Sequence, residues 1–267
     1  MQQENGAGRQ SGDGTGTGTG GVTGDGPGWV YRFAAAVLTP LVRLVARWEW
    51  RGGHHLPAAG GYITAVNHTS YADPVCYGLF QYHHGRPARF LGKAPLFSVP
   101  VLGAALRAMG HIPVYRNTVH ASDALVHAKE ALARGCCVAV YPEGTFTDDP
   151  QLWPSRAKTG VARLALETGA PVIPVAQWNA HEIIPAAGST VRRSRPWYRR
   201  TVVRVAAGPP VDLSDLRGQV ITAPVLAEAG LRIMDAITTL LEELREEPRP
   251  TARKPCPSST ADHLPQT

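Results

Sequence analysis

The most constraining feature of this chain is an uninterrupted apolar run at residues 136–141, CCVAVY, which follows a helix-like segment that stops at Gly135. A strand with one solvated face alternates apolar and polar residues, whereas a strand buried on both faces of a parallel sheet does not. Residues 61–66 (GYITAV) form a second short apolar run, and a further strand is expected at residues 171–176. Strands of this type alternating with helices indicate an α/β fold with a mixed, largely parallel central sheet flanked by helices.

Single residues that favour helix starts and stops predict the bounds of the other helices. Asp73 followed by Pro74 marks a helix start, Ser122 marks another, and Gly135 and Gly169 mark helix stops. The chain has 267 residues, of which 43% are hydrophobic, so it is long enough for one substantial domain with a core. This domain is expected at residues 49–246, with further helices at 102–109, 159–168 and 225–246 and further strands at 110–115 and 202–206.

The two ends differ in composition from the centre. Residues 1–28 are dominated by Gly, Thr, Ser and Gln, and residues 247–267 are rich in Pro and Ser. Such segments bury too little apolar surface to offset the entropy of ordering, so both are expected to be disordered tails. Neither shows the apolar stretch after a basic start that marks a signal peptide.

Residues 29–48 form an amphipathic segment in which apolar residues are mixed with Arg32, Arg43 and Arg47, and Trp29 and Trp48 stand at its ends. A helix here would place the three arginines near one face, and it could lie in a membrane interface. Packing on the core of the domain is the equal alternative. Pro40 is expected to kink the helix or divide it in two.

Charge and cysteine usage narrow the classes of partner. The formal net charge is +6, which favours an anionic partner: nucleic acid, an anionic membrane or a phosphorylated substrate. No zinc-finger or RNA-recognition signature occurs, so nucleic acid is not expected. The cysteines lack C-x-x-C spacing and are expected to be buried, reduced thiols of a cytosolic protein: Cys76, Cys136, Cys137 and Cys256.

The segment NHTSYAD at residues 67–73 places His68 and Asp73 five positions apart, directly after an expected strand. Histidine moves protons near neutral pH, and an aspartate can hold its ring in one tautomer. Asp73 could also only cap the following helix. On a regular helix, residues five apart diverge by about 140°, so a His68–Asp73 pair requires an intervening turn.

Two more polar residues follow expected strands. Arg116 comes after residues 110–115, and Glu143 comes after residues 136–141. In open α/β sheets, ligands bind in the crevice beyond the carboxyl ends of the strands. If the strands are parallel, His68, Arg116 and Glu143 therefore converge on one edge of the sheet.

Four segments in this order, NHTSYAD, GHIPVYR, VYPEGT and VIPVA, resemble the four blocks of the glycerolipid acyltransferases typified by 1-acylglycerol-3-phosphate (lysophosphatidic acid) acyltransferase. The resemblance covers about residues 50–210. It implies transfer of a fatty acyl group from acyl-CoA or acyl carrier protein to the sn-2 hydroxyl of 1-acylglycerol-3-phosphate, which gives phosphatidic acid for phospholipid biosynthesis. No cofactor beyond the thioester co-substrate is implied. The expected location is the cytoplasmic face of the cell membrane, peripheral or monotopic, with membrane lipids as partners.

The resemblance also implies residue roles. His68 matches the general base of the H-x4-D motif, and Asp73 matches its orienting partner. Arg116 matches the residue that binds the acceptor phosphate, although a surface ion pair is its alternative. Asn67 would orient the turn or the acyl carbonyl. In the E-G-T block, Glu143 would accept hydrogen bonds from glycerol hydroxyls or fix Arg116, while the amides of Gly144 and Thr145 face an anion.

One position departs from the family pattern. Members commonly continue E-G-T with arginine, whereas this chain has Phe146. Lys93 and Lys158 could replace the missing charge, and Lys93 could stabilise the oxyanion; both could equally be solvated lysines. An acceptor other than lysophosphatidic acid, such as another lysolipid, an aminolipid or a glycolipid, is therefore the first alternative. A non-catalytic lipid-binding protein is the second.

Two other groups of residues carry less weight. A metal site is not expected, because several histidines lack carboxylate or cysteine partners at ligand spacing: His54, His55, His83, His84 and His181. The basic run at residues 192–200, RRSRPWYRR, could rest on anionic headgroups or attract acyl carrier protein, with a solvated hairpin tip as the alternative.

Overall fold

The computed structural model describes residues 28–115, 123–187 and 199–250. Its centre is a seven-stranded sheet in the order β1-β7-β6-β2-β5-β3-β4. Strands β6, β2, β5, β3 and β4 are parallel, β7 is antiparallel to β6, and β1 is parallel to β7. The expected α/β fold with a mixed, largely parallel sheet is confirmed. The strand bounds are Ala46–Arg51 (β1), Tyr62–Val66 (β2), Ala88–Lys93 (β3), Ile112–Val114 (β4), Cys137–Val140 (β5), Val172–Trp178 (β6) and Thr201–Ala207 (β7).

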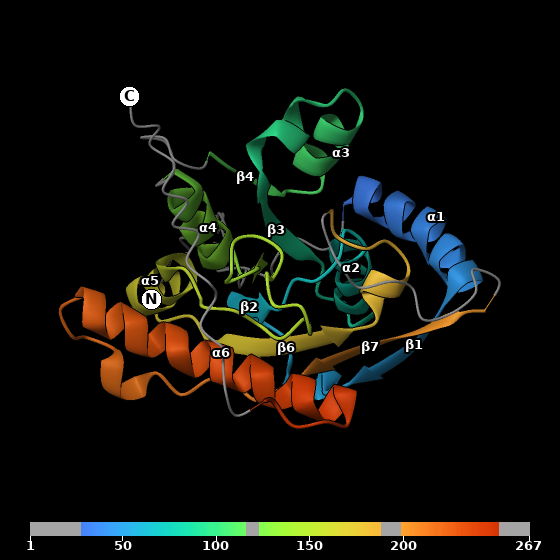
Figure 1. Cartoon of the computed structure of the whole chain (residues 1–267). Coiled ribbons are helices and arrows are strands. Elements are labelled where there is room, and N and C mark those ends of the chain that lie inside the picture. Colours follow the sequence, from blue (N-terminus) through green and yellow to red (C-terminus); the bar gives the residue numbers. More distant parts are fainter. Residues whose placement is uncertain (1–27, 116–122, 188–198, 251–267) are drawn as a thin grey trace, which may run out of the picture.

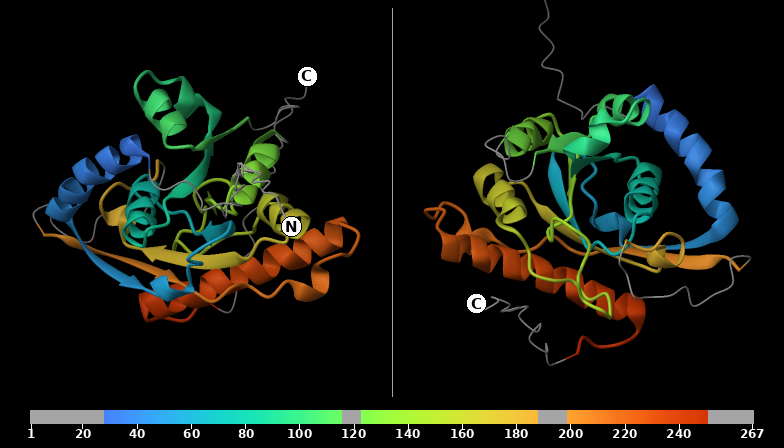
Figure 2. Two further views of the ribbon diagram at one scale, coloured as in Figure 1. Left: turned by 180° about the vertical axis from the view of Figure 1, so that it is seen from behind. Right: turned by 45° about the horizontal axis from the view of Figure 1, so that its top comes forward.

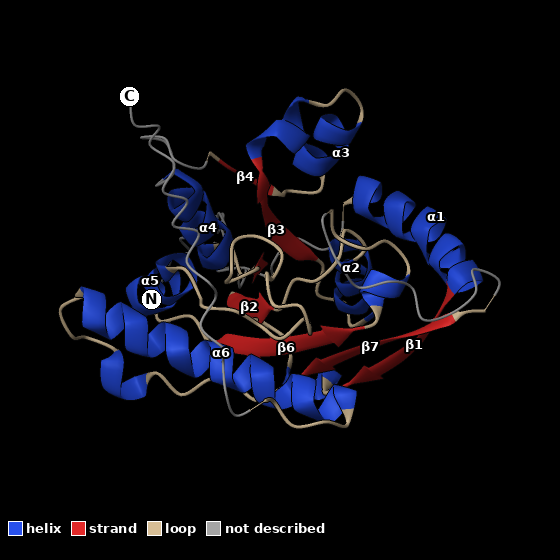
Figure 3. Ribbon diagram, in the orientation of Figure 1, coloured by secondary structure: helices blue, strands red, loops and turns tan. Residues whose placement is uncertain are grey.

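Helices cover both faces of this sheet (Figures 1 and 3). The helix bounds are Trp29–Val45 (α1), Asp73–His83 (α2), Leu102–Ala108 (α3), Asp123–Ala133 (α4), Thr159–Thr168 (α5) and Ala223–Arg245 (α6). Short 3-10 turns occur at Gly53–His55 (η1), Ala94–Ser98 (η2), Ala180–Glu182 (η4) and Ser214–Leu216 (η5).

Strand β2 shows how the core forms. Successive side chains of a strand point to opposite faces, and all five residues of β2 are buried. Ile63 and Ala65 pack in one cluster with residues of α4, α5 and α6, whereas Tyr62 and Val66 pack in another with residues of α2. The uninterrupted apolar pattern therefore reflects helices on both faces.

Most expected elements are present within a few residues. The helices expected at residues 102–109, 159–168 and 225–246 correspond to α3, α5 and α6, and the five expected strands correspond to β2, β4, β5, β6 and β7. The helix expected from Ser122 corresponds to α4, but Ser122 itself lies outside the described residues. Two strands were missed: β3, whose apolar residues are interrupted by Arg89 and Gly92, and β1.

The amino-terminal segment requires two corrections. Its helix ends at Val45, and residues 46–48 belong to β1, which pairs with β7 inside the sheet. The helix is also not divided at Pro40, because α1 runs through it as one element. Tyr31 and Ala35 of α1 are buried, so this helix packs on the domain, while its other side is exposed.

Some expectations fall largely or wholly outside the described residues. The tails at residues 1–28 and 247–267 are described only at Gly28 and residues 247–250, and the basic run 192–200 only at its last two residues. Cys256 and Arg116 are also outside. Cys76, Cys136 and Cys137 are free and buried as expected, and burial raises the pKa of Cys76 and that of Cys137 to about 12.

Candidate active site

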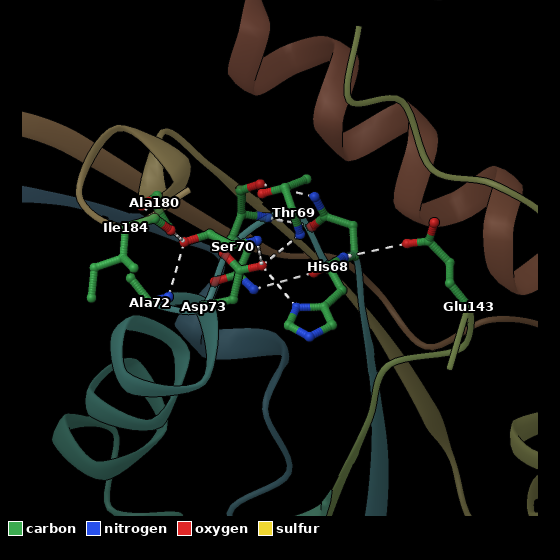
Figure 4. A network of polar contacts seen from close by, with 10 residues as sticks. His68, Thr69, Ser70, Ala72, Asp73, Glu143, Ala180 and Ile184 are labelled. Atoms are coloured by element: carbon green, nitrogen blue, oxygen red, sulfur yellow. Dashed lines mark hydrogen bonds and ion pairs between the residues drawn. The ribbon is translucent and has the colours of Figure 1, made fainter. Parts of the chain in front are cut away.

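The turn between β2 and α2 brings His68 and Asp73 together. His68 Nδ1 lies 2.9 Å from Asp73 Oδ2, and the same oxygen accepts hydrogen bonds from the backbone N–H groups of Thr69 at 2.6 Å and Ser70 at 2.8 Å (Figure 4). The chain thus wraps around one buried carboxylate oxygen, which supplies the turn that the five-residue spacing requires. Pairing with His68 and capping of the following helix are compatible if each oxygen of Asp73 makes one of these contacts. Instead, Oδ2 makes all three contacts, and Oδ1 has no hydrogen-bond partner within the described residues.

This contact fixes the protonation pattern of the imidazole. A carboxylate only accepts hydrogen bonds, so the proton of a neutral His68 lies on Nδ1 and Nε2 carries the free lone pair. The side chain is 15% exposed, whereas Asp73 is fully buried. The arrangement suits a general base whose tautomer is set by Asp73 at Nδ1, which leaves Nε2 to act as the base.

Ser70 anchors the turn to the segment after β6. Its single hydroxyl proton is shared between the carbonyl oxygens of Ile184 at 2.6 Å and Ala180 at 3.0 Å, and its oxygen accepts from the backbone N–H of Ala72 at 2.9 Å. Ser70 also pairs with Pro185 as an isolated antiparallel bridge. The position of Asp73 is therefore fixed by contacts more than 100 residues away in the sequence.

Asn67 serves the turn. Its Oδ1 accepts from the backbone N–H of Gln177 at 2.8 Å, and its Nδ2 donates to the Gln177 carbonyl at 3.0 Å. The Gln177 side chain returns a bond of 3.2 Å to the Asn67 carbonyl, and both residues are fully buried. The geometry fits the turn-orienting role of Asn67, since both polar atoms of its amide are used within the protein.

Glu143 joins the loops after β2 and β5. Its Oε1 accepts from the backbone N–H of His68 at 3.3 Å, and its Oε2 accepts from the backbone N–H and the hydroxyl of Ser155 at 2.9 and 2.8 Å. Thr147 adds a bond of 2.9 Å from its N–H to the His68 carbonyl. Burial raises the pKa of Glu143, and the bonds from Ser155 and His68 oppose that rise. Both carboxylate oxygens of Glu143 thus accept hydrogen bonds from the protein, and its expected role toward glycerol hydroxyls or Arg116 stays a prediction, since Arg116 lies outside the described residues.

Two aromatic rings pack against the His68 imidazole. Tyr141 stacks on it with centroids 4.0 Å apart, and Phe146 lies 4.2 Å from it at 45°. Tyr71 packs edge-on against Phe146 at 4.7 Å. The residue that departs from the family pattern therefore covers the catalytic candidate directly.

Two lysines approach the same loop. Lys93 Nζ lies 6.0 Å from the centre of the Phe146 ring. Gly144 has φ +71°, and a Cβ there would lie 2.9 Å from Lys158 Cδ and 3.3 Å from its Nζ. The glycine thus lets the Lys158 side chain lie across the E-G-T turn, while Thr145 is exposed. These positions bring cationic groups close to the turn that follows β5.

The positions singled out by sequence are thus partly assembled. Asn67, His68, Asp73, Glu143, Gly144, Thr145 and Lys93 lie around one edge of the sheet; Arg116 lies outside the described residues. Sequence reasoning missed Gln177, Ser70 and Ser155. Gln177 is a polar residue at the carboxyl end of an apolar strand. It could have been found in the same way as His68 and Glu143, which also follow strands. Among the described residues, no group of three or more His, Cys, Asp or Glu could hold a metal ion.

Comparison with known proteins agrees with this geometry. A family model described as Acyltransferase matches residues 47–178, which contain β2, β5 and the His68 turn. Together with the fold and the His68–Asp73 pair, this match defines the class of protein. Residues 47–178 of this chain belong to the acyltransferase family.

Several of the individual proteins that this chain resembles are 1-acyl-sn-glycerol-3-phosphate acyltransferases. A chloroplastic 1-acyl-sn-glycerol-3-phosphate acyltransferase of Brassica napus is 32% identical over 143 residues, which cover 53% of this chain and 40% of that protein. The 1-acyl-sn-glycerol-3-phosphate acyltransferase of Bacillus subtilis is 23% identical over 190 residues, which cover 70% and 84%. The crystal structure of the 1-acyl-sn-glycerophosphate (LPA) acyltransferase PlsC from Thermotoga maritima aligns with a TM-score of 0.59 and 24% identity over 81% of this chain and 78% of that one. The PlsC structure supports the fold. The chain spans less than half the length of the Brassica protein.

Proposed function

We propose that this chain transfers a fatty acyl group from acyl-CoA or acyl carrier protein to the sn-2 hydroxyl of 1-acylglycerol-3-phosphate, which yields phosphatidic acid. The observation that carries this proposal is the 2.9 Å contact between His68 Nδ1 and Asp73 Oδ2, which leaves Nε2 as the free base. The Brassica and Bacillus relatives are named 1-acyl-sn-glycerol-3-phosphate acyltransferases, and this similarity supports the acceptor.

The chemistry is a direct transfer. His68 Nε2 takes the proton from the acceptor hydroxyl while that oxygen bonds to the thioester carbon. The tetrahedral oxyanion then collapses, the carbon–sulfur bond breaks, and the thiolate takes the proton from the imidazolium to leave as a free thiol. Asp73 stabilises the imidazolium, as the aspartate does in a Ser-His-Asp triad, with substrate in place of serine. Lys93 or backbone amides would stabilise the oxyanion, and Arg116 would bind the phosphate.

A second acceptor class follows from Phe146. Its ring lies 4.2 Å from the His68 ring, where the family commonly carries an arginine. An apolar ring at this place favours a neutral group next to the attacked hydroxyl, as in a glycolipid or another lysolipid. Lys93 and Lys158 would supply charge for a phosphorylated acceptor.

The proposed location is the cytoplasmic face of the membrane, with α1 in the interface. Four large apolar side chains of α1 follow one another at four-residue spacing and are exposed: Trp29, Phe33, Val37 and Leu41. No helix among the described residues is long and apolar enough to cross a membrane. Interfacial binding is the mode that such a stripe supports.

The test is free thiol release by the purified chain in detergent with acyl-CoA or acylated carrier protein and a panel of lysolipids. His68→Ala should lower acceptor-dependent release about 10²- to 10⁴-fold, as expected for the loss of a general base. The matched control is His127→Ala, a surface histidine whose side chain is 57% exposed. Release that survives His68→Ala would overturn the mechanism, and no release with any pair of substrates would favour a lipid-binding protein.

A further inference from the structure

The turn that joins η2 to α3 presents an unusual apolar surface. Residues 96–102, which run from η2 through this turn to the first residue of α3 and are called the 96–102 turn, include four exposed apolar side chains: Leu96, Val99, Val101 and Leu102. Val101 is 84% exposed and has φ +63°, a conformation that is unfavourable for a β-branched residue. Apolar side chains of this size are usually buried, so their clustering at the tip of one turn indicates a surface for a partner.

Buried contacts of Phe97 and Gly103 fix the conformation of the turn. Phe97 is buried, and its ring lies against Gly92 of β3. Gly103 approaches the Phe97 carbonyl so closely that a Cβ there would lie 2.0 Å from the oxygen. The chain therefore inserts one aromatic anchor and directs its neighbours outward.

The amino-terminal end of α1 lies beside α3, and both lie on the side of the molecule away from α6 (Figures 1 and 2). The exposed stripe of α1 and the 96–102 turn thus belong to neighbouring elements. Two segments that are far apart in the sequence thus carry exposed apolar residues on neighbouring elements.

The segments that carry the exposed apolar residues are also basic. Residues 29–48 and 74–122 together contain eight Lys and Arg and no Asp or Glu. Because the whole chain carries +6, all other residues together carry −2. The basic and apolar segments thus coincide, while helix α6 on the opposite side carries more acidic than basic residues.

We propose that the 96–102 turn is a second membrane-binding element, which inserts Val101 and its apolar neighbours into an anionic lipid surface alongside α1. A bilayer requires no complementary shape, so it suits exposed aliphatic side chains at a turn, and anionic headgroups complement Arg107, whose guanidinium lies over the Phe97 ring. An acidic protein would use the same charges but would leave the most exposed aliphatic groups without a pocket.

The turn also connects to the candidate active site. Lys93 immediately precedes η2, and its Nζ lies 6.0 Å from Phe146, which packs on His68. That the turn helps to deliver an acceptor from the bilayer to His68 depends on the proposed function. The binding of the turn to lipid does not depend on it.

The test is sedimentation of the full chain with vesicles of equal parts phosphatidylcholine and phosphatidylglycerol. Val101→Asp should weaken binding about tenfold or more, since it removes an inserted apolar group and adds a like charge. The matched control is Val220→Asp, because Val220 is 81% exposed in the loop before α6. Binding of the unchanged chain should fall in high salt and with phosphatidylcholine alone.

Leu96→Ser combined with Val99→Ser provides a second, uncharged variant at positions without positive φ. Equal vesicle binding by the Val101 and Val220 variants, or unchanged binding by the double variant, would overturn the proposal. The proposal would also be overturned if these variants lost binding to an acidic carrier protein but still bound vesicles. Thiol release in detergent with a short-chain acceptor should persist in Val101→Asp; its absence from the unchanged chain would contradict the proposed function and leave the vesicle result standing.

Discussion

Glu143 supports the backbone of the candidate catalytic residue: its Oε1 lies 3.3 Å from the amide nitrogen of His68, although 75 positions separate the two residues. Strands β2 and β5 are hydrogen-bonded neighbours, so the loops beyond their carboxyl ends lie side by side. Ser155 occupies the other carboxylate oxygen. We infer that Glu143 acts through His68, as a positioning residue.

Glu143→Gln should therefore lower kcat about tenfold, because a displaced catalytic group loses its alignment with the substrate. Glutamine keeps one acceptor oxygen and can serve either His68 or Ser155, but not both. The KM for the acceptor should change by less than about twofold, as measured by steady-state thiol release. Ser155→Ala should have the smaller effect. A large rise in acceptor KM with kcat unchanged would instead support a direct contact between Glu143 and the glycerol hydroxyls.

Asp73→Asn should lower kcat by about 10²- to 10⁴-fold. An asparagine amide can donate to His68 Nδ1, which would place the ring proton on Nε2 and remove the base. It also cannot accept all the bonds that Oδ2 now receives from His68, Thr69 and Ser70. The measurement is single-turnover thiol release together with the urea midpoint. A midpoint shift with normal chemistry would reduce Asp73 to a helix-capping role.

Phe146→Arg should shift acceptor preference toward phosphorylated lysolipids about tenfold relative to a neutral lysolipid, because a guanidinium pairs with phosphate. Phe146→Leu is the control, since it shortens the ring contact with His68 without adding charge. Competition between the two acceptors in one assay gives the ratio directly. The same gain with leucine would assign the effect to space rather than charge.

His111 should make stability depend on pH. Burial, with a smaller contribution from Arg89, lowers its pKa from 6.5 to about 4. Unfolded His111 binds a proton below its ordinary pKa while the folded residue does not, so the free energy of unfolding falls as pH drops from 6.5 toward 4. The lost stability is up to about 3 kcal/mol.

His111→Gln should remove that pH dependence and keep an acceptor for the N–H of Phe90, which now lies 3.2 Å from His111 Nδ1. Urea unfolding at several pH values measures the slope. His127→Gln, at an exposed position, should leave the slope intact. An unchanged slope in His111→Gln would mean that other groups carry the acid sensitivity.

The fold followed from local patterns where those patterns were strong. The doubly buried strands β2 and β5 and the helix α5 were found because hydrophobic period and glycine stops are properties of adjacent residues. β1 was missed, since ARWEWR follows an apolar helical segment and owes its strand conformation to pairing with β7, about 155 positions later. Long-range pairing of this kind leaves little trace in a local window.

The sequence by itself determined the chemistry of this protein: a histidine and an aspartate at fixed spacing after a strand, and polar residues at other strand ends. Only the tertiary structure decided what those residues do to one another. It turned Glu143 and Asn67 toward the protein, placed Phe146 on His68, and brought the amino-terminal end of α1 beside α3 (Figure 1). The physical reason is that residue type and spacing fix local geometry, whereas hydrogen bonds across the sheet join residues that sequence order keeps far apart.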